Sequence, residues 1–313
     1  MIMKVLIVAS YNKSRFAPFI QEQADALVKA GCEIGYFGIQ GKGVSGYLKQ
    51  LSKLKKKIKE FQPDIIHAHY GLSGLLANLQ RRVPVVTTYH GSDINNAGVR
   101  KFSRIAMILS TYNVFVSQKT MDLVKPKRKF ILLPCGINLN DYPIVDKSEA
   151  RRLMGLDMQK KYVLFAGAFD NAVKNAPLAQ QAVVLLPDVE LLELKGYSRQ
   201  QVALLMQAVD CFLMTSFTEG SPQVIKEAMA CGCPIVSVDV GDVKERISGV
   251  KGCSVLESYS PDAIAAEIQK NIQFDGLTEG RNHIIEAGLT NETVADKLLR
   301  IYDGMIRQTT KYE

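Results

Sequence analysis

The sequence contains no apolar run that approaches the roughly 18 residues needed to cross a membrane. Its opening stretch, MIMKVLIVAS, is a poor signal peptide, because the apolar core covers only residues 5–9 and Asn12, Lys13 and Arg15 follow closely. A strand entering the core explains this stretch better. The sequence therefore predicts a cytoplasmic chain.

Two motifs typical of metal or nicotinamide binding are missing. The six cysteines include no Cys-x-x-Cys pair, and Cys231-Gly232-Cys233 is too tight for a usual zinc knuckle, so we expect free buried thiols and no metal there. The first predicted strand is followed by SYNKSRF rather than by Gly-x-Gly-x-x-Gly. This argues against a nicotinamide oxidoreductase.

Acidic residues are scarce in the first half of the chain. Residues 1–150 hold 22 Lys and Arg against 10 Asp and Glu, whereas residues 151–313 hold 17 against 21, which together give the net charge of +8. A basic half joined to a mildly acidic half predicts different partners for the two.

Short apolar runs alternate with helical patterns along both halves. Because parallel strands need long crossover connections, this alternation predicts an α/β fold with parallel sheets covered by helices on both faces. Residues 134–146 interrupt the rhythm with two prolines, a glycine and several Asx residues and predict a hinge. We expect two doubly wound domains, 1–138 and 139–289, with a C-terminal helix at about 290–313 that crosses back onto the first. The predicted strands are 4–9, 33–38, 64–69, 83–89, 113–116, 129–133, 162–167, 189–194, 210–215, 234–238 and 253–256, with helices between them at 18–31, 45–61, 175–186, 198–208 and 222–231.

The segment 47–61 is unusually rich in lysine. Its apolar residues repeat at intervals of four and three and predict one helix with its stripe on the core, while six lysines cover the remainder. An anionic membrane attracts such a helix by about 1 kcal/mol per lysine, so contact with the inner face of the membrane is a secondary hypothesis. Nucleic acid is not expected, because no basic groove with interleaved aromatic residues accompanies it.

The stretch TEGSPQVIKEAMACGCP, residues 218–234, sets two acids around a predicted helix start. Ser221 followed by Pro222 predicts an N-cap and a first helical residue, with Glu219 before the helix and Glu227 on its second turn. The free amides of a helix start favour an anion, and carboxylates accept hydrogen bonds from sugar hydroxyls. Taken alone, the pair is also explained as ordinary helix-terminal acids.

Further motifs occur with it in a familiar order. With PDIIHAHYG, VVTTYHGSD, LLPCGINLNDY, FAGAFDNAVKN and LKGYSRQQ, the chain resembles the retaining glycosyltransferases of family 4. The resemblance covers nearly the whole length and is strongest over residues 196–245. It implies the GT-B fold, in which two Rossmann-like domains face each other across a cleft, with the acceptor bound by the first domain and a nucleotide sugar by the second. The second half is a short variant, because helix 175–186 leads through one strand straight into KGYSRQQ.

The resemblance also implies roles for individual residues. Glu219 would contact hydroxyls of the transferred sugar and act in catalysis with His90 of YHGSD, Glu227 would bind the ribose, and Lys174 the phosphates. Gly196 and Tyr197 fall on the stretch that lines the pocket for the nucleotide base. The donor-binding residues implied in this way are Lys174, Gly196, Tyr197, Gly220, Ser221 and Glu227.

One departure from the family pattern concerns the phosphates. Ala168 stands where an arginine usually follows the glycine of FAG, so another cation must help Lys174 neutralise a diphosphate. Lys13 and Arg15, in the loop after the first strand, are candidates, and Asp93 is a further candidate contact for phosphate or acceptor.

No divalent cofactor is expected. No Asp-x-Asp follows a strand in a suitable place, so Lys174 and the helix start near Ser221 would stabilise the leaving diphosphate instead. The implied reaction is a retaining, metal-independent transfer from a nucleoside-diphosphate sugar to a glycan or lipid-linked acceptor, as in polysaccharide biosynthesis. The sequence identifies neither the sugar, the base nor the acceptor.

Two other functions are consistent with parts of the sequence. His67, His69 and His90 with Asp93 suggest a metal-dependent hydrolase, although that function leaves Lys174 and both glutamates without a role. For His67 a hydrogen-bonded core position is the better explanation. The missing arginine also leaves open a non-catalytic protein that binds nucleotide sugars.

Overall fold

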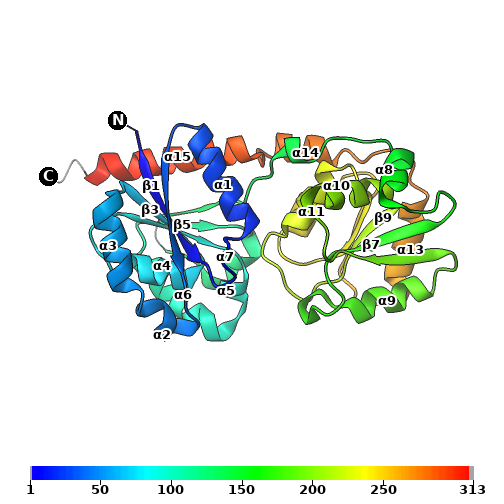
Figure 1. The fold of residues 1–313 in the computed structure, drawn as a ribbon. Coiled ribbons are helices and arrows are strands. Elements are labelled where there is room, and N and C mark those ends of the chain that lie inside the picture. The colour runs from blue at the N-terminus through cyan, green and yellow to red at the C-terminus, as the bar shows by residue number, and fades with distance from the viewer. Residues whose placement is uncertain (1, 128, 310–313) are drawn as a thin grey trace. The chain divides into compact units, whose positions relative to one another are not determined.

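The computed structural model describes residues 2–127 and 129–309 and divides into two compact units (Figure 1). Unit 1 comprises Met1–Gly136 together with the chain from Asn291 onward, and unit 2 comprises Ile137–Thr290. The expected boundary after residue 138 falls just inside unit 2.

Unit 1 is built on one parallel sheet with the strand order β2-β1-β3-β4-β5-β6. Its strands are β1 (Lys4–Ser10), β2 (Glu33–Ile39), β3 (Ile65–His69), β4 (Val85–Tyr89), β5 (Tyr112–Phe115) and β6 (Phe130–Leu132). Its helices are α1 (Pro18–Lys29), α2 (Gly43–Leu48), α3 (Leu51–Phe61), α4 (Gly71–Asn78), α5 (Ser92–Asn95), α6 (Ala97–Leu109), α7 (Gln118–Val124) and α15 (Asn291–Thr309).

Both faces of this sheet are buried, as the apolar runs predict. Along β1, Val5 and Ile7 belong to one core cluster, whereas Leu6 and Val8 belong to the cluster on the other face. The first cluster is completed by the far end of the chain, because α15 packs beside α1 with one apolar stripe (Figure 1). That stripe consists of Val294, Ala295, Leu298, Tyr302 and Met305.

Unit 2 repeats the architecture with the strand order β11-β10-β9-β7-β8. Its strands are β7 (Lys161–Phe165), β8 (Val189–Glu193), β9 (Cys211–Met214), β10 (Ile235–Val238) and β11 (Cys253–Leu256). Its helices are η1 (Leu139–Asp141), α8 (Lys147–Met154), η2 (Ala172–Lys174), α9 (Ala176–Val184), α10 (Arg199–Ala208), α11 (Gln223–Ala230), α12 (Val243–Ile247), α13 (Pro261–Ile272) and α14 (Gly280–Glu286). The predicted α/β class with two doubly wound sheets is confirmed.

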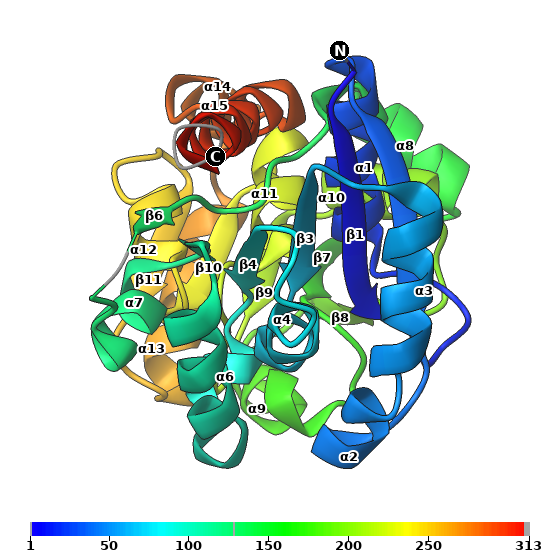
Figure 2. The same cartoon turned by 90° about the vertical axis from the view of Figure 1, so that its left-hand side faces the viewer.

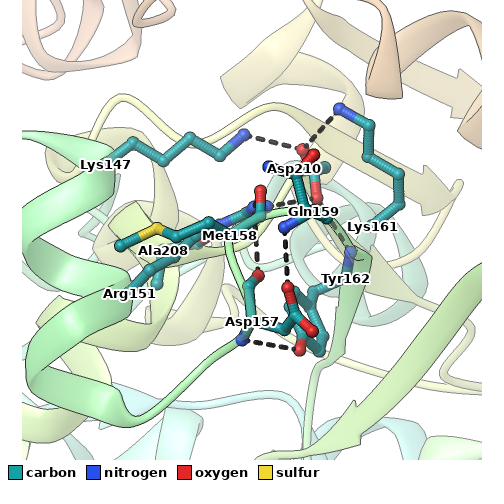
Figure 3. A network of polar contacts seen from close by, with 9 residues as sticks. All are labelled: Lys147, Arg151, Asp157, Met158, Gln159, Lys161, Tyr162, Ala208 and Asp210. Atoms are coloured by element: carbon teal, nitrogen blue, oxygen red, sulfur yellow. Dashed lines mark hydrogen bonds and ion pairs between the residues drawn. The ribbon is translucent and has the colours of Figure 1, made fainter.

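A buried carboxylate ties α8 to the amino ends of the unit 2 strands (Figure 3). Asp210 accepts from Lys147 Nζ and Arg151 Nη2, both at 2.8 Å, and from the Tyr162 N–H at 2.8 Å. Burial by itself raises the pKa of Asp210, but the hydrogen bonds from Lys147 and Tyr162 outweigh it and hold the pKa below its usual value. Ligands of doubly wound sheets bind at the opposite, carboxyl ends, so this network is structural.

The prediction of one helix over 47–61 was wrong in one respect. The chain forms two helices, α2 and α3, with a break at Lys49 and Gln50. Two contacts hold this region against the preceding loop. The Gln50 side-chain amide donates to the Gln40 carbonyl at 2.8 Å, and a Cβ on Gly41 would lie only 2.6 Å from the Gly46 carbonyl oxygen. The apolar stripe does face the core as predicted.

Candidate functional site

In unit 2 the strand order reverses between β7 and β9, and open α/β sheets bind ligands at the carboxyl ends beside such a switch point. Lys174 ends the short helix η2 that follows β7, and Glu219 lies in the loop that follows β9. Thr215 Oγ1 donates to the carbonyls of Lys174 and Asn175, each at 3.0 Å, and so joins the two loops.

Lys174 and Glu219 form an ion pair at this switch point. Lys174 Nζ lies 2.7 Å from Glu219 Oε1, and the two side chains are only 19% and 17% exposed. The family resemblance implies that both residues contact the donor, but the sequence gives no sign that they bind each other. The ammonium charge of Lys174 is therefore compensated by the carboxylate of Glu219.

Ser221 does not cap the helix, so that prediction was wrong. The N-cap residue of α11 is Pro222, whose side chain accepts no hydrogen bond from the free amides of the first turn. Ser221 Oγ instead donates to Asp242 Oδ2 at 2.8 Å. The helix begins one residue later than predicted, with Pro222 at the N-cap position, so Ser221 lies outside it and its hydroxyl is free to donate to the buried carboxylate of Asp242. Burial raises the pKa of Asp242, and the nearby charges of Lys226 and Arg246 counteract the rise.

Gly220 is fixed by a close backbone approach. A Cβ on Gly241, whose φ is +55°, would lie 2.3 Å from the Gly220 carbonyl oxygen and 3.2 Å from Glu219 Cβ. Only glycine at position 241 therefore lets the loop after β10 support the loop that carries Glu219. Sequence reasoning missed Gly241 and Asp242, although VDVGDVKE lies within the stretch of strongest resemblance.

The other donor-site candidates are distributed around these loops. Glu227 is half-buried on the second turn of α11. Gly196 has a φ of +81°, and Tyr197 is 41% exposed, so its ring is available for stacking. Ala168 follows β7, where the neighbouring Phe169 N–H donates to Glu193 Oε1 at 2.6 Å.

Unit 1 has a cavity of about 670 Å³ at the carboxyl ends of β1 and β3, again where the strand order reverses. Lys13 and Arg15 line it, as do Asp93 and two tyrosines, Tyr47 and Tyr70. The sequence reasoning named the cations and Asp93 but not the tyrosines. Tyr70 directly follows β3, and its φ of +73° is a conformation that non-glycine residues rarely adopt.

Asp93 shapes the turn that carries His90. Its carboxylate accepts from the backbone N–H groups of Gly71 at 2.9 Å, His90 at 3.0 Å and Gly91 at 3.1 Å. Burial raises the pKa of Asp93 to about 6, against the lowering effect of these bonds. Because the carboxylate is occupied by backbone donors, Asp93 acts on His90 as a support.

His90 is held by a neighbouring histidine, His69, which sequence reasoning grouped with it only in the metal-dependent hydrolase alternative. His90 Nε2 lies 3.1 Å from His69 Nδ1, and its ring packs against Phe19 and Tyr70. His69 is fully buried, and burial lowers its pKa well below the usual value, so it stays neutral. A neutral His69 can donate one proton or accept one, and thereby selects the tautomer of His90.

His67 is a core histidine. Its Nδ1 lies 2.6 Å from the Tyr302 hydroxyl and its Nε2 2.7 Å from Thr88 Oγ1, while burial lowers its pKa to about 3. With both ring nitrogens engaged, His67 has no lone pair for a metal. Within the described residues, no group of three His, Cys, Asp or Glu side chains could hold a metal ion. The three-histidine hydrolase site is therefore not assembled in this structure.

The chain is similar to known glycosyltransferases in sequence and in fold. Residues 22–141 match the family model described as Glycosyltransferase Family 4, and residues 158–273 match the one described as Glycosyl transferases group 1. TuaC of Bacillus subtilis (strain 168), a glycosyltransferase named for teichuronic acid biosynthesis, is 26% identical over 68% of this chain and 62% of its own length. A D-inositol 3-phosphate glycosyltransferase of Mycolicibacterium gilvum (strain PYR-GCK) is 27% identical over 70% of this chain and 60% of its own length. The chain thus matches about three fifths of the length of these curated relatives.

Solved structures share the fold over nearly the full length. Sucrose-phosphate synthase of Thermosynechococcus elongatus has a TM-score of 0.82 at 16% identity, with 99% of this chain and 100% of that chain covered. HepE of Anabaena, crystallised with UDP and glucose, has a TM-score of 0.73 at 18% identity, with 96% and 99% covered. The two doubly wound units are thus those of the GT-B fold. With both halves matched by glycosyltransferase models, the chain belongs to the family 4 glycosyltransferases.

Proposed function

We propose that the chain transfers a sugar from a nucleoside-diphosphate sugar to a glycan or lipid-linked acceptor, with retention of anomeric configuration and without a metal ion. The observation that carries this proposal is the pairing of Lys174 with Glu219 at the switch point of unit 2. A cation and an acceptor of hydroxyl hydrogen bonds, 2.7 Å apart, match the two chemically different parts of a sugar diphosphate.

Donor binding would exchange one anion for another on Lys174. The diphosphate takes over the ammonium group, and Glu219 is released to accept hydrogen bonds from the sugar. Glu227 binds the ribose, and the base stacks near Gly196 and Tyr197. Uracil is the first donor base to test, since HepE of Anabaena was crystallised with UDP and with UDP-glucose.

The leaving diphosphate needs positive charge as the glycosidic bond breaks. Lys174 and the amides at the start of α11 supply it in this proposal, since Ala168 stands where an arginine is usual. The departing phosphate oxygen accepts the proton of the attacking hydroxyl on the same face of the sugar, which retains the configuration. His90, oriented by His69, holds a sugar hydroxyl.

The acceptor would be held by unit 1. Its cavity combines two cations, Lys13 and Arg15, with the rings of Tyr47 and Tyr70. Tyrosine rings pack against sugar faces, and the cations suit an acceptor that carries phosphate or carboxylate groups.

Binding and release of nucleotide test the proposal together. UDP- and GDP-sugars should raise the melting temperature of the purified chain, and nucleoside diphosphate should be released when a glycan acceptor is added. Lys174→Ala should abolish both effects. Lys195→Ala is the matched control, because Lys195 forms an equally short, exposed ion pair with Asp170 at 2.7 Å.

The outcomes separate the alternatives. Binding without turnover on any acceptor would favour the non-catalytic nucleotide-sugar-binding protein. If no sugar nucleotide stabilises the chain, or if Lys174→Ala binds as well as Lys195→Ala, the proposed donor site is wrong.

A further inference from the structure

Unit 1 carries a basic surface that neither candidate site uses. Residues 97–132 hold eight lysines and arginines and a single acid, Asp122. The outer face of α6 contributes Lys101 and Arg104, while Lys125 and Lys127 follow α7. All four of these cations are exposed.

Large apolar side chains are exposed among these cations. Each is at least 38% exposed, which is uncommon for so many large apolar residues on neighbouring elements. They are Ile105, Ile108 and Leu109 on α6, Leu123 on α7, and Phe130 and Leu132 on β6.

These residues lie on neighbouring elements of unit 1, and we call them together the α6–β6 surface. Lys101, Arg104, Ile105 and Ile108 follow helical spacing and share one face of α6. α6 and α7 pack on the same small core cluster, and a groove of about 330 Å³ between α6 and residues 124–127 is lined by Arg104, Ile108, Lys125 and Lys127. On β6, at the edge of the sheet, Phe130 and Leu132 lie two residues apart and point to one face.

The lysine-rich helix α3 differs from the α6–β6 surface because its apolar side chains face the core. Leu54 is fully buried, and Leu51, Ile58 and Phe61 pack against the core, so α3 presents its lysines without an exposed large apolar side chain of its own. α3 also packs against β2, at the sheet edge opposite β6. Figure 2 shows α3 on one side of unit 1 and α7 with β6 on the other.

We propose that the α6–β6 surface, and not α3, is where the chain contacts an anionic lipid bilayer. Its cations attract acidic headgroups, and its apolar side chains enter the boundary between headgroups and acyl chains. A surface that holds cations and apolar side chains next to each other can therefore contact the acidic headgroups and the upper acyl chains at the same time. This inference does not depend on the proposed sugar transfer, because binding is measured without turnover.

Two variants, each with three cations replaced by glutamine, test which surface contacts the membrane. The full chain is mixed with vesicles of phosphatidylcholine, alone or with phosphatidylglycerol, and bound protein is measured by sedimentation. Replacing Arg104, Lys125 and Lys127 with glutamine should lower binding to the anionic vesicles about a hundredfold. Replacing Lys53, Lys55 and Lys59 of α3 with glutamine, the control, should lower it less than about fivefold. Melting temperatures establish that both triple variants fold.

The absence of tryptophan from the sequence allows a second test. Phe130→Trp puts a single fluorophore on the α6–β6 surface, and Lys56→Trp puts one on α3. Anionic vesicles should shift the emission of the first to shorter wavelength and shield it from acrylamide, and should leave the second unchanged.

Several results would overturn the proposal. These are equal losses in the two triple variants, a shift confined to the Lys56→Trp protein, or binding that does not depend on phosphatidylglycerol. A concentration-dependent shift of the Phe130→Trp protein without vesicles would instead identify a second copy of the chain as the occupant. Absence of vesicle binding would likewise end the proposal.

Discussion

The ion pair between Lys174 and Glu219 dominates the electrostatics of the proposed donor site. A diphosphate that approaches Lys174 must compete with a carboxylate already 2.7 Å away, and the two side chains are largely shielded from water. The carboxylate therefore opposes nucleotide binding, even though in our proposal it assists the sugar.

Glu219→Gln should separate these two effects. Removing the charge should tighten the binding of a free nucleoside diphosphate about two- to fivefold, the value of a typical partly exposed ion pair. Turnover should fall by about 10- to 100-fold, because the amide accepts sugar hydroxyls less strongly. Calorimetry and steady-state kinetics measure the two quantities. Glu227→Gln is the control and should weaken nucleotide binding; weaker binding in Glu219→Gln would contradict the assignment.

His67 should make unit 1 sensitive to acid. Its pKa is about 3 in the folded chain against an ordinary value of 6.5, so the unfolded chain binds a proton in this interval and the folded chain does not. Its contribution to stability is therefore complete above pH 6.5 and is lost as the pH falls from 6.5 towards 3, by about 1.4 kcal/mol per pH unit. Asp93, with a pKa raised to about 6 from 3.8, opposes this loss between those two values.

His67→Gln should flatten the dependence of stability on pH. Urea unfolding at pH 5 and pH 7 should show a smaller difference between the two midpoints than in the unchanged chain. An unaltered difference would mean that folding does not lower the pKa of His67.

At the scale of elements, α15 connects the two ends of the chain within unit 1. Leu298 is fully buried in the cluster beneath β1, and Tyr302 on the same stripe reaches the imidazole of His67, 235 residues away in sequence. The expectation that a C-terminal helix crosses back onto the first domain agrees with this packing, but only the structure identifies which face of the sheet the helix covers.

Leu298→Ala should therefore destabilise unit 1, although the residue lies near the C-terminus. The loss should be about 2–5 kcal/mol, as for other fully buried leucines. Amide hydrogen exchange should rise in β1 and β3 and remain unchanged in β7 and β9. Arg300→Ala, on the exposed face of the same helix, should have little effect. Faster exchange in β7 and β9 alone would contradict the position of α15.

At the scale of the whole molecule, the proposed chemistry relies on side chains and helix amides for positive charge. Sugar transfer should therefore be unchanged by a chelator, measured as nucleotide release with and without EDTA. Loss of activity that added Mg²⁺ or Mn²⁺ restores would show that a metal replaces the missing arginine at Ala168.

None of the described helices combines the length and the apolar character of a membrane span.

The elements of the fold were predictable because each is determined over a short stretch. Strands buried on both faces form continuous apolar runs, and helices repeat every three or four residues, so the sequence indicates nearly all of them. The failures lie at helix ends: Gln50 bonds to a backbone carbonyl where α2 ends, and α11 begins after Pro222, so that Ser221 lies outside the helix and donates to Asp242.

The sequence by itself determined the α/β class, the two doubly wound sheets and the residues with the right chemistry for a sugar nucleotide. Only the tertiary structure decided which of them meet. Lys174 and Glu219, 45 residues apart, form a pair because β7 and β9 lie side by side, and His69 reaches His90 because β3 and β4 do. Strand order depends on long-range packing of whole elements, and no local pattern in the sequence encodes it.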